Sequence, residues 1–138
     1  MDDVLEQLVR RRAGNACEYC RLPQQFSRLT FTIDHVIARQ HHGPTIESNL
    51  ALACAFCNLH KGPNIAGIDP QTTQMTRLFH PRRDVWTEHF RWNGAMMIGL
   101  TDIARATISV LAINHPAQLA MRNTLIDEGE LPGRQGVG

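Results

Sequence analysis

Two Cys-x-x-Cys pairs constrain the fold of this 138-residue chain more than any other feature of its sequence. Cys17 and Cys20 form the first pair, and Cys54 and Cys57 form the second, with no cysteine left over. A two-residue gap lets both sulfur atoms of a pair reach one ion, and four thiolates complete the tetrahedral shell of a structural Zn²⁺. Two disulfides or four buried free thiols are the alternatives, and a reducing compartment favours zinc over disulfides.

The composition is that of a globular protein, because 43% of the residues are hydrophobic. A segment of roughly 50 residues buries too little core to fold alone, so a metal that closes it supplies stability. No apolar run approaches the ~20 residues of a membrane span. The N-terminus, M-D-D-V-L-E-Q-L, is acidic and lacks the positive start of a signal peptide. We therefore expect a cytoplasmic protein with no membrane partner.

Basic residues gather in the middle of the chain, although the formal net charge is only +1. Between residues 10 and 91 there are eleven Lys or Arg against six Asp or Glu, an excess of 11 − 6 = +5. Arginine suits phosphate contacts because its planar fork binds two oxygens at once. A solvated basic face is an equally good interpretation of charge alone.

The pattern of helix and turn signals predicts a mixed α+β chain. We expect an N-terminal helix over 2–13, short strands over 29–33 and 49–54, and a helix from the second cysteine pair to Gly62-Pro63. Residues 63–81 are rich in turn formers and read as a connector. Asn93-Gly94 predicts a hairpin between strand-like runs that include 85–92. Helices are expected over 102–113 and 116–127, followed by a frayed tail.

An acid and an imidazole stand side by side between the cysteine pairs, as Asp34-His35. Asn49 lies fourteen residues beyond His35, Asn58 nine beyond Asn49, and Lys61 three beyond Asn58. With C-E-Y-C and C-A-F-C-N-L-H-K-G, this set resembles the HNH endonuclease family, whose catalytic unit is a ββα-metal finger, here in its zinc-bearing form. The resemblance covers roughly residues 14–65, and the segment that follows resembles small stand-alone bacterial HNH proteins.

The resemblance implies a role for each matched residue. His35 is expected to be the general base that takes a proton from water. Asp34 and Asn58 are expected to hold one divalent cation, Mg²⁺ or Mn²⁺, with hard oxygen ligands. Asn49 is expected to be a structural residue that orients the site. His60 is a further candidate for the metal, although it lies about 200° around the helix from Asn58.

Several basic residues are candidates for nucleic-acid contact. Lys61 shares the helix face of Asn58, where it either touches phosphate or complements the helix dipole. Trp86 and Trp92 alternate with arginines, a pattern that fits a stacking surface but fits packing of a hairpin onto helices better. The candidates for contact are Lys61, Arg39, Arg82 and Arg83.

The sequence thus predicts a zinc-stapled, treble-clef-like ββα-metal finger with an N-terminal helix and a C-terminal hairpin plus two helices. We expect residues 1–138 to form a single domain, with 14–65 as the HNH core and 66–138 packed on it. The predicted function is metal-dependent hydrolysis of DNA phosphodiesters, with no small-molecule cofactor; RNA stays open as a substrate, and so does the oligomeric state. The alternative is a non-catalytic zinc-finger module that binds nucleic acid or protein, which has no use for Asp34, His35 and Asn58 together.

Overall fold

The computed structural model describes residues 1–132, so the part of the predicted frayed tail beyond residue 132 lies outside the described residues. The chain has a mixed α+β fold, as predicted. It divides into two compact units. Unit 1 comprises Met1–Ile65 and His80–Asp84, and unit 2 comprises Ala66–Phe79 and the chain from Val85 onward. The expected packing of residues 66–138 on the 14–65 core stays a prediction.

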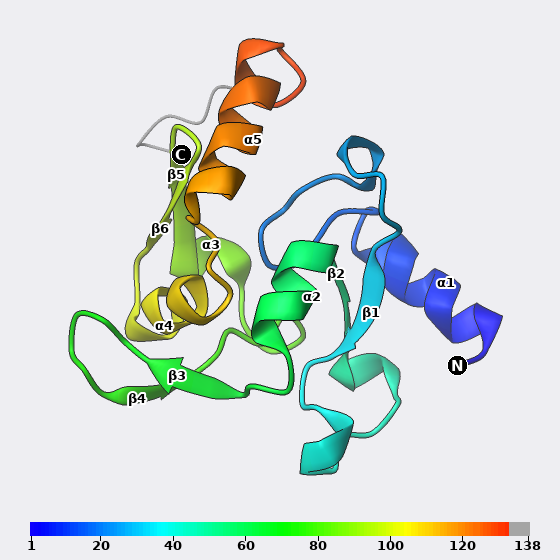
Figure 1. The fold of residues 1–138 in the computed structure, drawn as a ribbon. Helices are drawn as coiled ribbons and strands as arrows, with labels where there is room; N and C mark the ends of the chain where they lie inside the picture. Colours follow the sequence, from blue (N-terminus) through cyan, green and yellow to red (C-terminus); the bar gives the residue numbers. More distant parts are fainter. Residues whose placement is uncertain (133–138) are drawn as a thin grey trace. The chain divides into compact units, whose positions relative to one another are not determined.

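Unit 1 is built from two helices and one antiparallel strand pair (Figure 1). The N-terminal helix begins where the Asp2 carboxylate accepts a 2.8 Å hydrogen bond from the Leu5 amide, and its first turn carries further acids that suit the helix dipole. In the strand pair, Asp34 lies opposite Ala51. The elements are α1 (Asp3–Arg12), β1 (Thr32–His35), β2 (Leu50–Ala53) and α2 (Ala55–Lys61), with short 3₁₀ turns at Gln24–Phe26, Arg39–His41 and Glu47–Asn49.

The core of unit 1 lies around β2, all of whose residues are buried. The first cysteine pair is tied to this strand through Glu18. The Glu18 amide donates to the Leu52 carbonyl at 2.8 Å, and the Leu52 amide donates to the Glu18 carboxylate at 2.9 Å. Because β2 leads directly to the second cysteine pair, these bonds bring the two pairs together.

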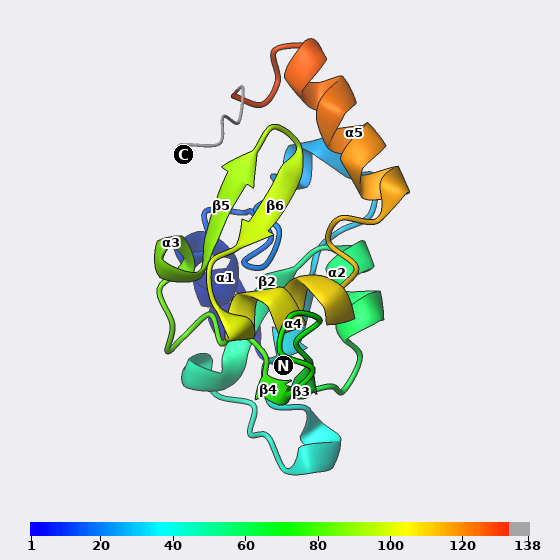
Figure 2. The same ribbon diagram turned by 90° about the vertical axis from the view of Figure 1, so that its left-hand side faces the viewer.

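Up to residue 132, unit 2 contains two hairpins and three helices (Figure 2). Phe79, Trp86 and Phe90 form its aromatic core, with 5.2 Å between the ring centroids of Phe90 and each of the other two. The guanidinium of Arg122 lies 5.5 Å from the centroid of the Trp92 ring. Trp86 is thus buried in unit 2 and Trp92 is half-buried against Arg122, in line with the packing interpretation. The elements are β3 (Ala66–Ile68), β4 (Met75–Arg77), α3 (Trp86–His89), β5 (Phe90–Asn93), β6 (Met96–Gly99), α4 (Asp102–Val110) and α5 (Pro116–Asp127).

Two predictions about this part of the chain were wrong. Residues 63–81 were expected to be a connector, but they contain the β3–β4 hairpin. The Asp69 carboxylate closes the turn of this hairpin by accepting hydrogen bonds from the Gln71 amide and the Thr72 hydroxyl. The Arg105 guanidinium donates two further hydrogen bonds to the same carboxylate. The run from residue 85 was expected to be strand throughout, but Trp86–His89 is a turn of helix before β5. The predictions of the Asn93-Gly94 hairpin and of α5 are confirmed.

Local shifts also separate the predicted and observed strands of unit 1. The first strand was expected over 29–33 and is observed over Thr32–His35, because the side chains of Gln24 and Ser27 donate to the Leu29 carbonyl and hold that residue in a turn. None of the described helices has the length and hydropathy needed to cross a membrane.

Candidate active site and metal centre

The four cysteines form one buried cluster in unit 1. Their sulfur atoms all lie within 4.8 Å of one another, and none is in a disulfide. The sulfur atoms of Cys20 and Cys54 are 3.7 Å apart. Tetrahedral ligation at the usual Zn–S distance of about 2.3 Å places sulfur atoms about 3.8 Å apart. The cluster therefore fits a four-thiolate zinc site.

The backbone around the cluster supports the same interpretation. The Cys20 amide points to the Cys17 sulfur and the Cys57 amide to the Cys54 sulfur, each at 3.4 Å. Cys54 is also the N-cap of α2. Hydrogen bonds with Cys17 and then with the other two thiols lower the pKa of Cys54, whereas the hydrogen bond with Cys17 is the first cause that raises the pKa of Cys20 and of Cys57. The cluster indicates a structural zinc, because four protein ligands leave no position for substrate.

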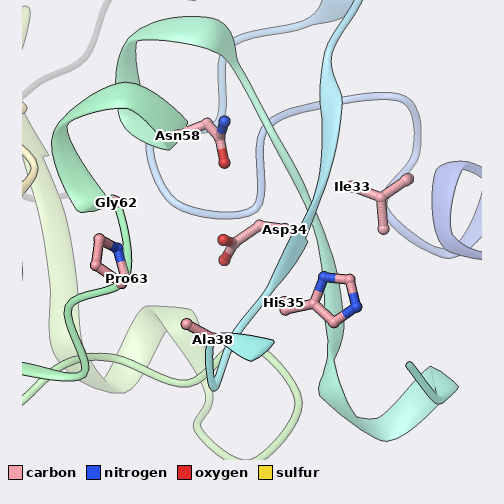
Figure 3. A pocket seen from close by; sticks show the side chains of 7 residues that line it. All are labelled: Ile33, Asp34, His35, Ala38, Asn58, Gly62 and Pro63. Carbon is pink, nitrogen blue, oxygen red and sulfur yellow. The ribbon is translucent and has the colours of Figure 1, made fainter. Parts of the chain in front are cut away.

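A second feature is an open pocket of about 320 Å³ beside β1 (Figure 3). Its polar lining comes from Asp34 and His35 on β1 and from Asn58 on α2. Figure 3 shows the Asp34 carboxylate and the His35 ring on opposite sides of the strand, and the Asn58 amide oxygen directed toward Asp34. The remaining lining residues are Ile33, Ala38, Gly62 and Pro63.

Asp34 is 6% exposed and is held from behind by two side chains. The Tyr19 hydroxyl donates to its Oδ2 atom at 2.7 Å, and the Lys61 ammonium lies 3.2 Å from the same atom. Burial raises the pKa of Asp34, while the Lys61 charge and the Tyr19 hydrogen bond oppose that rise. Burial, and then the Asp34 charge, raise the pKa of Tyr19 well above its ordinary value, so the phenol keeps the proton that it donates.

The position of Lys61 corrects its assignment as a nucleic-acid contact. Its side chain is 1% exposed, and its ammonium donates to the Val36 carbonyl at 3.0 Å as well as to Asp34. The α2 face that carries Lys61 turns toward β1, and an ammonium at such depth is stabilised by these internal acceptors. Lys61 is therefore an internal partner of Asp34 and is withdrawn from the contact candidates.

His35 is half-buried at the end of β1. Its Nε2 atom lies 2.8 Å from the Thr45 hydroxyl, in the loop before β2. Among the described residues, its Nδ1 atom has no hydrogen-bond partner. Burial, and then the positive charge of Arg39, lower the pKa of His35 below its ordinary value. The imidazole is thus favoured in the neutral form that can accept a proton.

Asn49 is 5% exposed and clamps the loop that follows β1. Its side-chain oxygen accepts from the Ile37 amide at 2.9 Å, and its amide group donates to the carbonyls of Ile37 and Pro44 at 3.0 and 2.9 Å. A Cβ atom on Gly43 would lie 1.7 Å from the Ile37 carbonyl oxygen, so only glycine fits there. These contacts fix the backbone that carries Asp34 and His35.

His60 and the arginine candidates occupy different surroundings from the pocket residues. The His60 Nδ1 atom is hydrogen-bonded to the Phe56 carbonyl at 2.9 Å, and the centroids of the two rings are 4.1 Å apart. His60 is not among the described residues that line the pocket. Arg82 pairs with the buried carboxylate of Glu18, and its side chain is 17% exposed, so its nucleic-acid contact stays a prediction. Arg39 and Arg83 are exposed.

Sequence reasoning missed two residues of this site, Tyr19 and Thr45. Tyr19 is visible inside the first Cys-x-x-Cys pair, but nothing in the sequence links it to a carboxylate fifteen residues away. Thr45 lies in a loop marked only by turn formers. Both contacts depend on how the loops fold back toward β1.

Comparison with known proteins gives one positive result. Residues 17–64 match the family model described as HNH endonuclease. Searches of curated proteins and of solved structures give no match. The matched segment contains the four cysteines, the whole lining of the Asp34 pocket, and both side chains that hold Asp34. Such a match suggests nuclease activity with a zinc-stabilised fold. Residues 17–64 of this chain are therefore similar to an HNH endonuclease domain.

Proposed function

We propose that the chain is a metal-dependent endonuclease that hydrolyses DNA phosphodiester bonds at the Asp34 pocket. One observation carries the proposal: a carboxylate, an amide oxygen and an imidazole from Asp34, Asn58 and His35 meet around one open cavity. Residues 34 and 58 come from different elements, so their meeting is a product of the fold. The volume of about 320 Å³ is that of a small ligand site.

The donor set suits a hard divalent cation. Asp34 and Asn58 offer oxygen atoms toward the same space (Figure 3), which is the chemistry that Mg²⁺ or Mn²⁺ prefers. When bound, such a cation would neutralise charge on the scissile phosphate and stabilise the departing 3′ oxygen. His60 is a weaker candidate, because its Nδ1 atom bonds its own helix.

His35 is proposed as the general base. Its Nε2 atom faces Thr45, which leaves Nδ1 as the atom that accepts the proton of the attacking water. Asp34 and His35 line the same pocket but point apart along β1 (Figure 3), so the carboxylate can hold the cation while the imidazole faces the attacking water. Asn49 is proposed as the orienting residue, because its three side-chain hydrogen bonds hold the loop behind the site.

Arg39 and Arg83 are the proposed nucleic-acid contacts. Both are exposed, and Arg39 directly follows the pocket residue Ala38. An exposed guanidinium next to the cavity suits a phosphate flanking the scissile one. On the family resemblance, the products are a 5′-phosphate and a 3′-hydroxyl.

A plasmid-nicking assay tests the proposal. Wild type, His35→Ala and His41→Ala are incubated with supercoiled DNA in Mg²⁺, Mn²⁺ or EDTA. His41 is an exposed loop histidine, so it is the matched control. We expect metal-dependent nicking that falls by about 10²-fold or more in His35→Ala, with circular dichroism unchanged and His41→Ala fully active.

The remaining outcomes separate the alternatives. Equal activity of wild type and His35→Ala would reject the base assignment. DNA binding without cleavage under every metal condition would favour the non-catalytic zinc-finger module. A parallel incubation with single-stranded RNA of matching sequence decides the substrate class, and cleavage of RNA alone would replace DNA in the proposal.

A further inference from the structure

The Asp34 carboxylate has two side-chain partners that do not line the pocket. Tyr19 donates to Oδ2 at 2.7 Å, and Lys61 lies 3.2 Å from Oδ2 and 3.4 Å from Oδ1. Neither residue is among the described residues that line the pocket. Tyr19 and Lys61 are each 1% exposed, so both contacts are made out of reach of solvent.

Each of the two supporting side chains is itself anchored. Tyr19 stands between two cysteines of the zinc cluster, Cys17 and Cys20, and is fixed with them. Lys61 ends α2, the helix that begins at the second cysteine pair, and its ammonium also donates to the Val36 carbonyl at 3.0 Å. Both supports of Asp34 therefore trace back to the segments that the cysteine cluster closes.

We propose that Tyr19 and Lys61 are positioning residues that hold the Asp34 carboxylate toward Asn58, and that the zinc cluster sets the geometry of the second cation site through them. This inference rests on the proposed function, because it assumes that Asp34 binds the catalytic cation. Tyr19 and Lys61 thereby join the proposed site, and the structural zinc would stabilise the fold and also fix the position of a ligand to the second cation.

The chemistry of the carboxylate supports this arrangement. An ionised carboxylate has about four lone-pair positions, and Tyr19 and Lys61 use those at the back. The Asn58 amide oxygen is directed toward Asp34 (Figure 3), and the proposal leaves the remaining positions of the carboxylate to a cation on that side. A buried carboxylate that lost these partners would keep its desolvation cost without compensation. Partners behind a metal ligand commonly change metal affinity or activity by about 10- to 100-fold.

Mn²⁺ binding by the zinc-loaded full chain tests the inference without relying on cleavage. Free Mn²⁺ is followed by electron paramagnetic resonance during titration of wild type, Tyr19→Phe and Lys61→Met. Zinc content and circular dichroism are measured on the same samples. Leu59→Gln is the matched control, because Leu59 lies on α2 next to Asn58 and is 76% exposed.

We expect Tyr19→Phe and Lys61→Met to keep their zinc and their fold while the Kd for Mn²⁺ rises about tenfold or more. Leu59→Gln should bind as wild type does. Nicking should require correspondingly more Mn²⁺ in the two variants.

Wild-type Mn²⁺ affinity in both zinc-loaded variants would overturn the inference. Loss of zinc in Tyr19→Phe would show that Tyr19 supports the zinc cluster and does not position Asp34. The inference would then be tested by Lys61→Met alone, because this substitution lies outside the cysteine pairs. Asp34→Asn separates a failure of this inference from a failure of the proposed function. If wild type and Asp34→Asn bind Mn²⁺ alike and wild type does not nick DNA, the proposed function itself fails.

Discussion

The Nε2 atom of His35 and the Oγ1 atom of Thr45 are 2.8 Å apart. When the threonine hydroxyl accepts from Nε2–H, Nδ1 is the unprotonated nitrogen of a neutral imidazole, which is the tautomer that the proposed base requires. Thr45 lies ten residues from His35, on the loop that Asn49 also holds. The contact therefore links the tautomer of the proposed base to the fold of one loop.

Replacement of Thr45 tests this link. In Thr45→Val the Nε2 atom loses its partner while the shape of the side chain is kept, so the ring is free to turn and to change tautomer. We expect nicking to fall roughly tenfold, within the range of a general-base contribution, with little change in thermal stability because Thr45 is exposed. Thr45→Ser keeps the hydroxyl and should restore most of the rate. Equal rates for the valine and serine variants would contradict the proposed role.

The pH dependence of cleavage should report the lowered pKa of His35. Burial and the Arg39 charge both disfavour the imidazolium, so the pKa lies below the ordinary value of 6.5. The neutral base is the active form, and therefore the rate should rise with pH through a midpoint below 6.5 and then level off. An NMR titration of the imidazole signals gives the same pKa independently of cleavage.

Arg39→Gln should move that midpoint upward. Removal of the positive charge makes protonation of His35 easier, so the pKa rises and the rate on the acid side of the midpoint falls. Arg28→Gln is the matched control, since Arg28 is an exposed loop arginine of the same unit. An unchanged midpoint in Arg39→Gln, or an equal shift in both variants, would show that Arg39 does not act on His35.

Removal of zinc should unfold unit 1. The cysteine cluster joins the segment before β1 to the start of α2, and structural zinc sites of this kind contribute on the order of 10 kcal/mol to folding. We expect about one zinc per chain by elemental analysis. Chelation, or Cys57→Ser, should open residues 14–65 to limited proteolysis, with the cleavage sites mapped by mass spectrometry.

The control for the zinc prediction is a reductant without chelator. Tris(2-carboxyethyl)phosphine, a reductant without thiol groups, should leave the proteolysis pattern unchanged, because the four cysteines form no disulfide in the structure. A metal-free protein that resists protease as well as the zinc-loaded form does would contradict the prediction.

Features with a local cause were predictable from the sequence. Helix α5 begins at Pro116, which suits a first helical position, and the β5–β6 turn follows Asn93-Gly94. The β3–β4 hairpin was missed because its turn is closed by Asp69, whose carboxylate is held by Arg105 from 36 residues further along the chain. No short-range pattern reports such a contact.

The sequence alone predicted the cysteine cluster and the residues of the Asp34 pocket in outline. The spacing of the cysteine pairs is enough to predict one tetrahedral cluster, because two residues between ligands already fix which sulfur atoms can share an ion. Asp34-His35 and Asn58 were identifiable because their order and spacing match a family. Only the tertiary structure decided which side chains contact Asp34. Tyr19 and Lys61 reach Asp34 across 15 and 27 residues, and Lys61 is buried because α2 turns that face toward β1. Side-chain burial and long-range pairing depend on how elements pack, and a linear pattern does not carry that information.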